Sequence, residues 1–328
     1  MIFLHAGHII ITTEPDTPLI VMRTKSGHLI FIGIFMENNT NLKPQQPALS
    51  VAEQIENLRK LNLIIDDYDY AYRILNDISY FRLIKAYSLG LKPKNSDYQN
   101  GVTFSQIVDL YKFNAKFRQL IFPLIERAEI NLRCKISNYF SEKYDVLGYE
   151  DVNNFENPVY HQSFLDELSH EIGRNSKSPF VRNFRSNYVD GKLPMYAAIE
   201  LFPFGMLSKF YRNMKPADKT DIAKSYGLDY IYLQSWIENI AYVRNLCAHY
   251  GRLYNARLTK TPRLYKRYRD ENIPNNKVYA TLICLKYLIP DLSHWITFVS
   301  DMQELLREFP NVDIGTMGFP KDWQFHLL

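Results

Sequence analysis

The strongest constraint on the fold is a long stretch of helical periodicity between Phe104 and about Phe140. Apolar residues recur there three and four positions apart, at Ile107, Leu110, Tyr111, Phe117, Leu120, Ile121, Leu124, Ile125, Ala128 and Leu132. This spacing gathers apolar side chains on one face of an α-helix. We therefore predict one long helix, kinked at Pro123 because proline lacks the amide hydrogen that a helix interior requires.

Shorter stretches of the same periodicity cover most of the chain after Pro47. They predict helices near residues 50–61, 67–78, 160–172, 179–188, 195–213, 217–226, 229–249, 276–289 and 292–308. The aromatic segment from Ile78 to Tyr87 is short of helical signals, so an extended or turn-like crossing is predicted. After the first 35 residues no run requires a sheet, and the predicted fold class is all-α, with helices packed on one another.

The first 35 residues have a different character, with β-branched alternation and no helical period. Two interpretations remain open: a β-hairpin, or an extension upstream of a start at Met36. We divide the chain into an N-terminal extension at 1–45, a helical region at 46–150 and a region at 151–328. The last two regions are either separate or one compact domain.

Cysteine content and hydropathy narrow the class of protein. The three cysteines, Cys134, Cys247 and Cys284, are unpaired and lack metal-ligand spacing, which favours a reducing compartment and argues against a zinc site. Charged residues separate the N-terminal apolar runs, which are too short to span a bilayer. We expect a cytoplasmic protein with no membrane anchor, cofactor or metal.

The segment Arg244-Asn245-Leu246-Cys247-Ala248-His249 is the candidate site, because it sets a permanent cation, an amide and an imidazole within six residues. These groups can cleave RNA without a metal: the imidazole exchanges protons near neutral pH, the cation stabilises the transition state and the amide orients the phosphate or the imidazole. The same arginine-to-histidine spacing occurs at Arg23 and His28. Spacing alone therefore carries little weight.

Helical geometry places Arg244 inside an apolar stripe, formed by Leu233, Trp236, Ile237, Ile240, Val243 and Cys247. A guanidinium on such a face needs a partner or a ligand. One interpretation is a structural ion pair with a carboxylate such as Glu129 or Glu200, and the other is a functional site.

Asn245 and His249 share a different face, about 140° from Arg244 around the axis. Arg244 and His249 cannot meet on a regular helix. Either the last turn distorts before Gly251, or two copies of the helix form the site across a two-fold axis, which would also supply two histidines.

A cationic segment follows the motif. Seven basic residues and no acid lie between Arg252 and Arg269, namely Arg252, Arg257, Lys260, Arg263, Lys266, Arg267 and Arg269. Tyr254, Tyr265 and Tyr268 are interleaved with them, a pattern suited to single-stranded RNA. The alternative is a solvated charged face with the tyrosines half buried beneath it.

Several longer segments resemble the abortive-infection family of bacterial phage-defence proteins, of the AbiD and AbiF type. In family order they are EQIENLRKLNLIIDD, ISYFRLIKAY, FSQIVDLYKFNAKFRQLIFPLIERAEINLRCKI, ELFPFGMLSKFYRNM, WIENIAYVRNLCAHYGRLYN and MGFPKDW. The resemblance runs from about Gln46 to the end of the chain. Arg23 and His28 lie outside it, which makes their spacing a coincidence.

The resemblance implies a helical HEPN-like ribonuclease fold. In it, Arg244, Asn245 and His249 match the R-N-x-x-x-H signature, and Arg252 and Asn255 match a downstream R-x-x-N. Glu200 falls where such domains often carry a polar residue facing the motif, although Pro203 departs from the family pattern and alters the start of that helix. The resemblance also implies a toxin held in check by a small noncoding RNA.

Three functions follow as hypotheses. The first is a homodimeric, metal-independent endoribonuclease with Arg244, Asn245 and His249 as catalytic residues. Glu200, Arg252, Asn255, Arg257, Arg263, Lys266 and Arg267 would support the site or bind RNA. The second is a noncatalytic module that senses or sequesters a structured RNA, and the third is a protein-interaction scaffold.

Overall fold

The computed structural model describes residues 9–14, 17–23, 29–33, 45, 47–94 and 96–328. They belong to two compact units, Met1–Ser50 and Val51–Leu328. Met36, the alternative start, and His28 lie outside the described residues.

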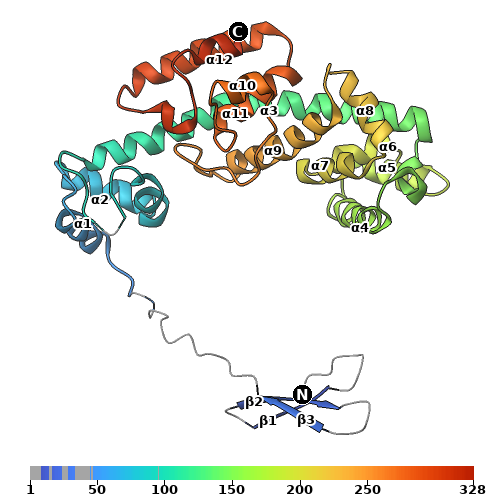
Figure 1. The fold of residues 1–328 in the computed structure, drawn as a ribbon, viewed down its shortest axis with the longest axis horizontal. Helices are drawn as coiled ribbons and strands as arrows, with labels where there is room; N and C mark the ends of the chain where they lie inside the picture. The colour runs from blue at the N-terminus through green and yellow to red at the C-terminus, as the bar shows by residue number, and fades with distance from the viewer. Residues whose placement is uncertain (1–8, 15–16, 24–28, 34–44, 46, 95) are drawn as a thin grey trace. The chain divides into compact units, whose positions relative to one another are not determined.

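The first unit contains a small antiparallel sheet. Its strands are β1 (Ile9–Glu14), β2 (Thr17–Arg23) and β3 (Leu29–Gly33), hydrogen-bonded in the order β1-β2-β3 (Figure 1). Ile9 pairs with Met22, and Leu19 of β2 pairs with Gly33. The β-branched residues that disfavour a helix suit these strands.

The second unit is all-α, as predicted. Its α-helices are α1 (Val51–Lys60), α2 (Tyr68–Asp77), α3 (Phe104–Tyr144), α4 (Pro158–Arg174), α5 (Pro179–Asn187), α6 (Met195–Ala198), α7 (Phe204–Asn213), α8 (Pro216–Lys224), α9 (Tyr230–Ala248), α10 (Lys266–Asp270), α11 (Val278–Leu288), α12 (Leu292–Glu308) and α13 (Trp323–Leu327). One π-helical turn, η1 (Phe81–Lys85), and four 3-10 turns, η2 (Gly148–Glu150), η3 (Val152–Asn154), η4 (Ile199–Leu201) and η5 (Ile314–Met317), complete the described elements.

The long helix α3 is the axis on which this unit is built. Thr103 and Gln106 form a capping box at its start, and the helix continues through Pro123. Helices α1 and α2 lie near its first turns, α4–α8 near its last turns, and α9, α11 and α12 along its middle (Figure 1). Its buried face, which includes Phe113 and Phe140, fills the core of the unit.

Of the two alternatives predicted for Ile78 to Tyr87, the extended crossing is wrong, because the helical turn η1 occupies the segment. Leu83, Ile84 and Tyr87 are all buried, a spacing that fits a helical turn packed on the core. The π-helical turn offsets the backbone by one residue, which hides the signal from a search for 3.6-residue periodicity.

The single helix predicted at 195–213 is also wrong, because it is broken before Pro203. Phe202 is extended, with ψ of 119°, and η4 ends there before α7 begins at Phe204. A proline disfavours the helical conformation of the residue that precedes it. The short helices α10 and α13 are additions that periodicity did not predict.

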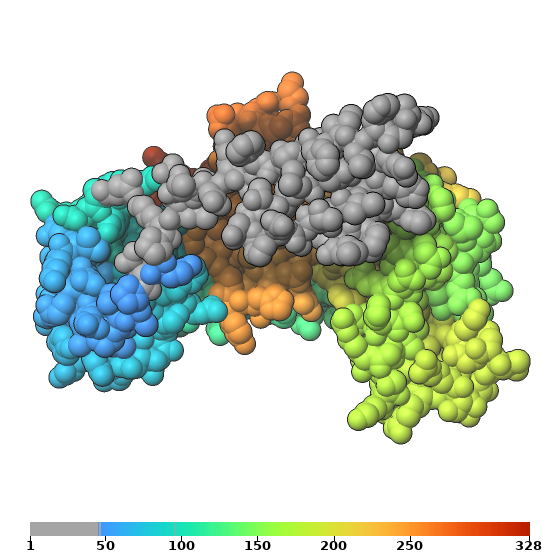
Figure 2. Space-filling view, turned by 90° about the horizontal axis from the view of Figure 1, so that it is seen from below, coloured from blue at the N-terminus to red at the C-terminus, as the bar shows by residue number. Residues whose placement is uncertain are grey.

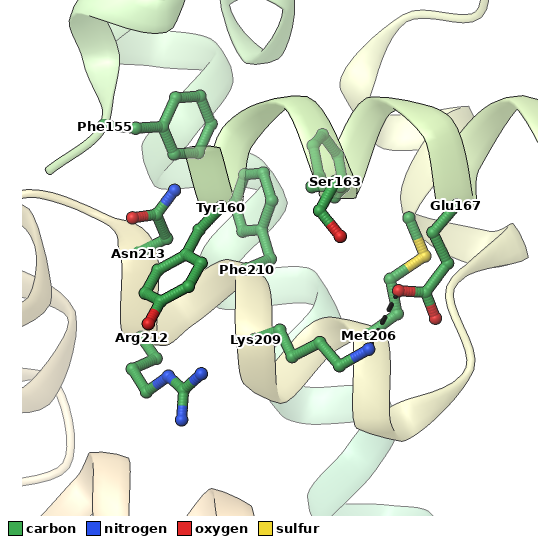
Figure 3. Close-up of a pocket in the computed structure, with 10 residues that line it drawn as sticks. Phe155, Tyr160, Ser163, Glu167, Met206, Lys209, Phe210, Arg212 and Asn213 are labelled. Carbon is green, nitrogen blue, oxygen red and sulfur yellow. Dashed lines mark hydrogen bonds and ion pairs between the residues drawn. The ribbon is translucent and has the colours of Figure 1, made fainter. Parts of the chain in front are cut away.

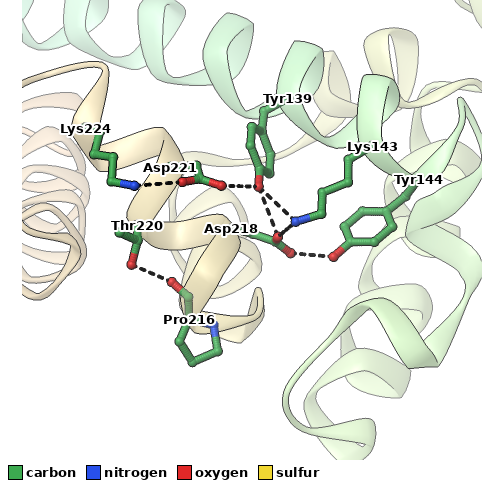
Figure 4. Close-up of polar contacts among 8 residues, drawn as sticks. All are labelled: Tyr139, Lys143, Tyr144, Pro216, Asp218, Thr220, Asp221 and Lys224. Carbon is green, nitrogen blue, oxygen red and sulfur yellow. Dashed lines mark hydrogen bonds and ion pairs between the residues drawn. The ribbon is translucent and has the colours of Figure 1, made fainter.

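A buried carboxylate joins the end of α3 to α8 (Figure 4). Asp218 accepts hydrogen bonds from Lys143 at 2.5 Å, from Tyr144 at 2.8 Å and from Tyr139 at 3.1 Å. Burial raises the pKa of Tyr139 to about 12, so its hydroxyl stays a donor at neutral pH. Three donors compensate for the desolvation of this carboxylate.

Candidate functional site

Helix α9 carries Arg244 at the edge of its buried stripe. The six apolar residues predicted to form the stripe are all buried, and Asp229 caps the first turn by accepting a hydrogen bond from the amide of Ile231. The side chain of Arg244 is 35% exposed. Nε of Arg244 is therefore buried, whereas other atoms of its side chain are accessible to solvent.

The carboxylate facing Arg244 is that of Glu129 on α3. Its Oε2 lies 3.6 Å from Nε of Arg244, which is an ion pair beyond hydrogen-bond distance. Its Oε1 accepts a hydrogen bond of 2.5 Å from Arg133, which also donates to the backbone oxygens of Ile199 and Phe202. One carboxylate thus faces two guanidinium groups, so the cluster carries a net positive charge.

Of the two carboxylates considered for Arg244, the structure selects Glu129. Glu200 lies on η4 with an exposed side chain, and no ion pair or hydrogen bond of its carboxylate occurs within the described residues. Its turn is nevertheless attached to the same cluster, because Arg133 binds the carbonyl of Ile199.

Asn245 and His249 lie at the exposed end of α9. The helix ends at Ala248, and His249 is the C-terminal cap residue, with φ of −99° and ψ of 22°. The amides of Gly251 and Tyr250 bond back to the carbonyls of Leu246 and Cys247, which is the Schellman arrangement. The last turn of α9 therefore departs from regular helical geometry just before Gly251, as the first of the two predicted alternatives requires.

Tyr250 occupies the left-handed position of this helix end. Its φ is 58°, a conformation that a glycine adopts more easily, and its side chain is 68% exposed. Arg82 of η1 donates to the Tyr250 carbonyl at 3.2 Å. The bulky ring is thus held at the surface directly after His249.

Two polar residues on the buried face of α3 fix the backbone that follows His249. Asn114 is fully buried, and its Oδ1 accepts hydrogen bonds from the amides of Leu253 and Tyr254 at 2.7 and 2.9 Å. Its Nδ2 and Nη1 of Arg118 both donate to the carbonyl of Gly251. Sequence reasoning missed both residues, although a polar pair on an apolar helix face was a usable signal.

A groove of about 390 Å³ runs between α3 and the end of α9. Its walls come from Ala115, Arg118, Gln119, Phe122, Pro123, Cys247, Ala248 and Tyr250. Burial raises the pKa of Cys247 to about 12, so this thiol is protonated at neutral pH and is a poor nucleophile. The groove offers an apolar wall and one guanidinium beside the candidate site.

In the cationic segment 252–269, some basic side chains have partners within the protein and others form no ion pair among the described residues. Lys260 forms an ion pair with Glu238 at 2.6 Å, and Arg267 donates to the hydroxyls of Tyr268 and Tyr287. Arg263 and Lys266 are exposed, and their side chains have no ion pair among the described residues. Figure 2 shows the orange segment that follows α9 at the surface between α1–α2, in blue, and α4, in yellow-green.

The tyrosines of this segment do not form an open stacking surface. Tyr254 and Tyr268 are 8% and 4% exposed. Tyr265 packs against Tyr232, with ring centroids 4.4 Å apart, in an aromatic cluster with Trp236. Of the two alternatives for this segment, buried tyrosines rather than exposed stacking rings fit Tyr254 and Tyr268, because both rings contribute to the core.

A second hollow lies between α4 and α7 (Figure 3). Phe155, Phe164 and Phe210 line it, Lys209 and Glu167 form an ion pair of 3.0 Å at one side, and Arg212 and Tyr160 lie at the other. It shares no residue with the groove beside α9.

Metal-binding clusters and membrane-spanning helices are both absent from the described part of the chain. No group of three or more His, Cys, Asp or Glu residues there has the geometry to hold a metal ion. No helix there is long and apolar enough to cross a membrane.

Comparison with known protein families shows which family the chain belongs to. The model of the family described as "Abi-like protein" matches residues 73–255, which include η1, α3, α9 and the segment from Arg244 to Asn255. The chain belongs to the Abi-like protein family. No curated protein and no solved structure matches it. The matched region includes Asn114, Arg118 and Glu129, so the α3 residues that position the candidate site lie within the family region.

Proposed function

We propose that this Abi-like protein acts in abortive infection as a homodimeric endoribonuclease that requires no metal ion. The observation that carries the proposal is the end of α9, where Asn245 and His249 are exposed one turn apart and Arg244 is only partly neutralised by Glu129. The backbone after His249 is fixed by Asn114 and by Arg118. Exposed reactive groups on a fixed backbone suit catalysis.

The proposed reaction is in-line attack of a ribose 2′-hydroxyl on the adjacent phosphate. The bond from the phosphorus to the 5′-oxygen breaks, leaving a 2′,3′-cyclic phosphate and a 5′-hydroxyl. His249 of one copy takes the 2′ proton, and His249 of the other copy donates a proton to the leaving oxygen. Arg244 stabilises the additional negative charge on the phosphorus oxygens, and Asn245 orients the phosphate or the imidazole.

A two-fold assembly is the proposed way to bring Arg244 and His249 to one phosphate. On a regular helix, positions 244 and 249 lie about 140° apart around the axis, which separates the two groups within one copy. Two copies of the α9 end, related by a two-fold axis, would bring two arginines and two histidines together. A small noncoding RNA is the proposed restraint, since it would occupy the same cationic surface.

Two substitutions test the proposal. We expect His249→Ala and Arg244→Ala each to lower RNA cleavage in the presence of a chelator by at least about a hundredfold. His170→Ala, on the exposed face of α4, is the matched control. Cleavage at the wild-type rate by both site variants, with folding unchanged by circular dichroism, would contradict the proposal.

A noncatalytic RNA-binding function is the second candidate. Arg252, Arg257, Arg263 and Lys266 favour it, because in the described part of the chain they form no ion pair and they attract a polyanion whether or not cleavage follows. RNA binding without cleavage under any condition would support this alternative.

A further inference from the structure

Arg252, Arg257 and Lys277 follow the end of α9 and form no ion pair with a carboxylate among the described residues. Nη1 of Arg252 donates to the carbonyl of Tyr254 at 2.9 Å, and Nζ of Lys277 donates to Oδ1 of Asn255 at 3.3 Å. Arg257 follows two residues after Asn255. Lys277, which precedes α11, is thereby brought beside a segment more than twenty positions earlier in the chain.

The charges of these three residues act on one another. Burial lowers the pKa of Arg252, and burial together with the positive charges of Arg252 and Arg257 lowers the pKa of Lys277. No ion pair within 4.0 Å involves any of the three in the described ranges. Like charges held together at reduced hydration are unfavourable unless an anion joins them.

The carboxylate of Asp313 lies near this segment and is already hydrogen-bonded. Its Oδ1 accepts the amide hydrogen of Gly315 and caps η5. By contrast, Lys260 and Arg267 of the same basic segment have partners within the protein. An external anion bound at Arg252, Arg257 and Lys277 would therefore relieve the repulsion between these three charges.

We propose that Arg252, Arg257 and Lys277 form a binding site for one phosphate of an RNA backbone, adjacent to the bond that is cleaved. The choice of RNA as the ligand rests on the proposed function. Arg252 is three residues after His249, and Asn114 and Arg118 both donate to the carbonyl of Gly251 between them. The site binds a neighbouring phosphate and places the scissile one at the end of α9. Lys277 lies outside the region matched by the family model.

The test measures RNA affinity in the full chain carrying His249→Ala, which keeps the probe intact. The probe is a fluorescein-labelled single-stranded RNA of about 12 nucleotides. Lys277→Gln and Arg257→Gln are each compared with Lys177→Gln, an exposed lysine between α4 and α5 that removes the same charge. Glutamine keeps much of the length of each side chain, and Arg257 is exposed, so its substitution leaves the core intact.

The loss of RNA affinity on removing one phosphate contact can be calculated from the salt dependence of binding. For single strands the logarithm of affinity falls by about 0.7 per contact for each tenfold rise in salt, which makes one contact worth about fourfold at 0.15 M salt. We expect Lys277→Gln and Arg257→Gln each to weaken binding by about fourfold and to reduce the salt slope by about 0.7, with Lys177→Gln unchanged.

Unchanged affinity and slope in both variants would overturn the phosphate site, as would absence of RNA binding by the parent protein. Cleavage by the protein with His249 intact is measured in parallel. Cleavage combined with unaffected binding in the variants contradicts the phosphate site alone. Weakened binding in the variants without any cleavage contradicts the ribonuclease proposal alone.

Discussion

Nε of Arg244 lies 3.6 Å from Oε2 of Glu129, so the arginine of the candidate site is held by a carboxylate from a helix more than a hundred residues earlier in the chain. Arg133 binds the other oxygen of the same carboxylate at 2.5 Å. Glu129 therefore connects the candidate site to the packing of η4 against α3.

Glu129→Gln should lower the free energy of unfolding by about 1–3 kcal/mol, because two partly buried guanidinium groups lose their counter-charge. Urea unfolding monitored by circular dichroism measures this change. Glu126→Gln, on the exposed face of the same helix, is the control and should change stability by less than about 0.5 kcal/mol. Equal stability of the two variants would show that the pairing of Glu129 contributes nothing.

Asn114→Leu should destabilise the protein by about 2–4 kcal/mol and slow RNA cleavage, because two buried amides lose their acceptor and the carbonyl of Gly251 loses one of its two donors. Asn131→Leu is the matched control on α3, since Asn131 is exposed and accepts one hydrogen bond from Tyr226. Thermal unfolding and cleavage rate are measured for both. Full cleavage by Asn114→Leu would mean that the fixed backbone is irrelevant to the site.

Iodoacetamide at pH 8 should modify Cys134 and leave Cys247 and Cys284 unmodified in the folded protein. Cys134 is exposed, whereas burial raises the pKa of Cys247 to about 12, so the thiolate fraction is negligible. The unfolded thiol has a pKa near 9.0, so the stability from keeping Cys247 protonated is present below pH 9 and is lost as the pH rises toward 12. Mass spectrometry identifies the labelled residue, and Cys134→Ser serves as the control. Labelling of Cys247 as fast as Cys134 would contradict this prediction.

Mixed dimers test whether one site needs both copies. Wild-type and His249→Ala chains with different tags are co-expressed in equal amounts, and the total activity is compared with wild type. If both histidines serve one site, only dimers of two wild-type chains are active, and about a quarter of the activity remains. A site completed within one copy would retain about half. Co-expression with His170→Ala, which should retain full activity, controls for the tags.

The local sequence pattern was sufficient to predict most of the helices. It was not sufficient to predict which residues contact the side chains of the candidate site. The predicted helix at 229–249 and its buried stripe are confirmed, because apolar periodicity is a local property of the sequence. The pairing of Arg244 with Glu129 depends on how α3 and α9 pack, so the sequence left Glu129 and Glu200 as alternatives. The roles of Asn114 and Lys277 were not recognised for the same reason.

The burial of two tyrosines and the conformation of one turn were also not predicted from the sequence. Tyr254 and Tyr268 look suited to RNA in a basic segment, but a tyrosine between charges fits a core position equally well when its ring reaches inward. The helical conformation of the turn at Phe81–Lys85 was not predicted, because a π-helical turn shifts the helical spacing by one residue.

The most direct test of the central claim is the chemistry of the RNA ends. The full chain is incubated in chelator with an RNA of defined sequence, and with the same RNA carrying a 2′-deoxyribose at the cleaved position. The account predicts a 2′,3′-cyclic phosphate and a 5′-hydroxyl from the first RNA, no cut at the substituted position, and no products with His249→Ala. Products bearing a 5′-phosphate, or cleavage at the deoxyribose, would contradict attack by the 2′-hydroxyl.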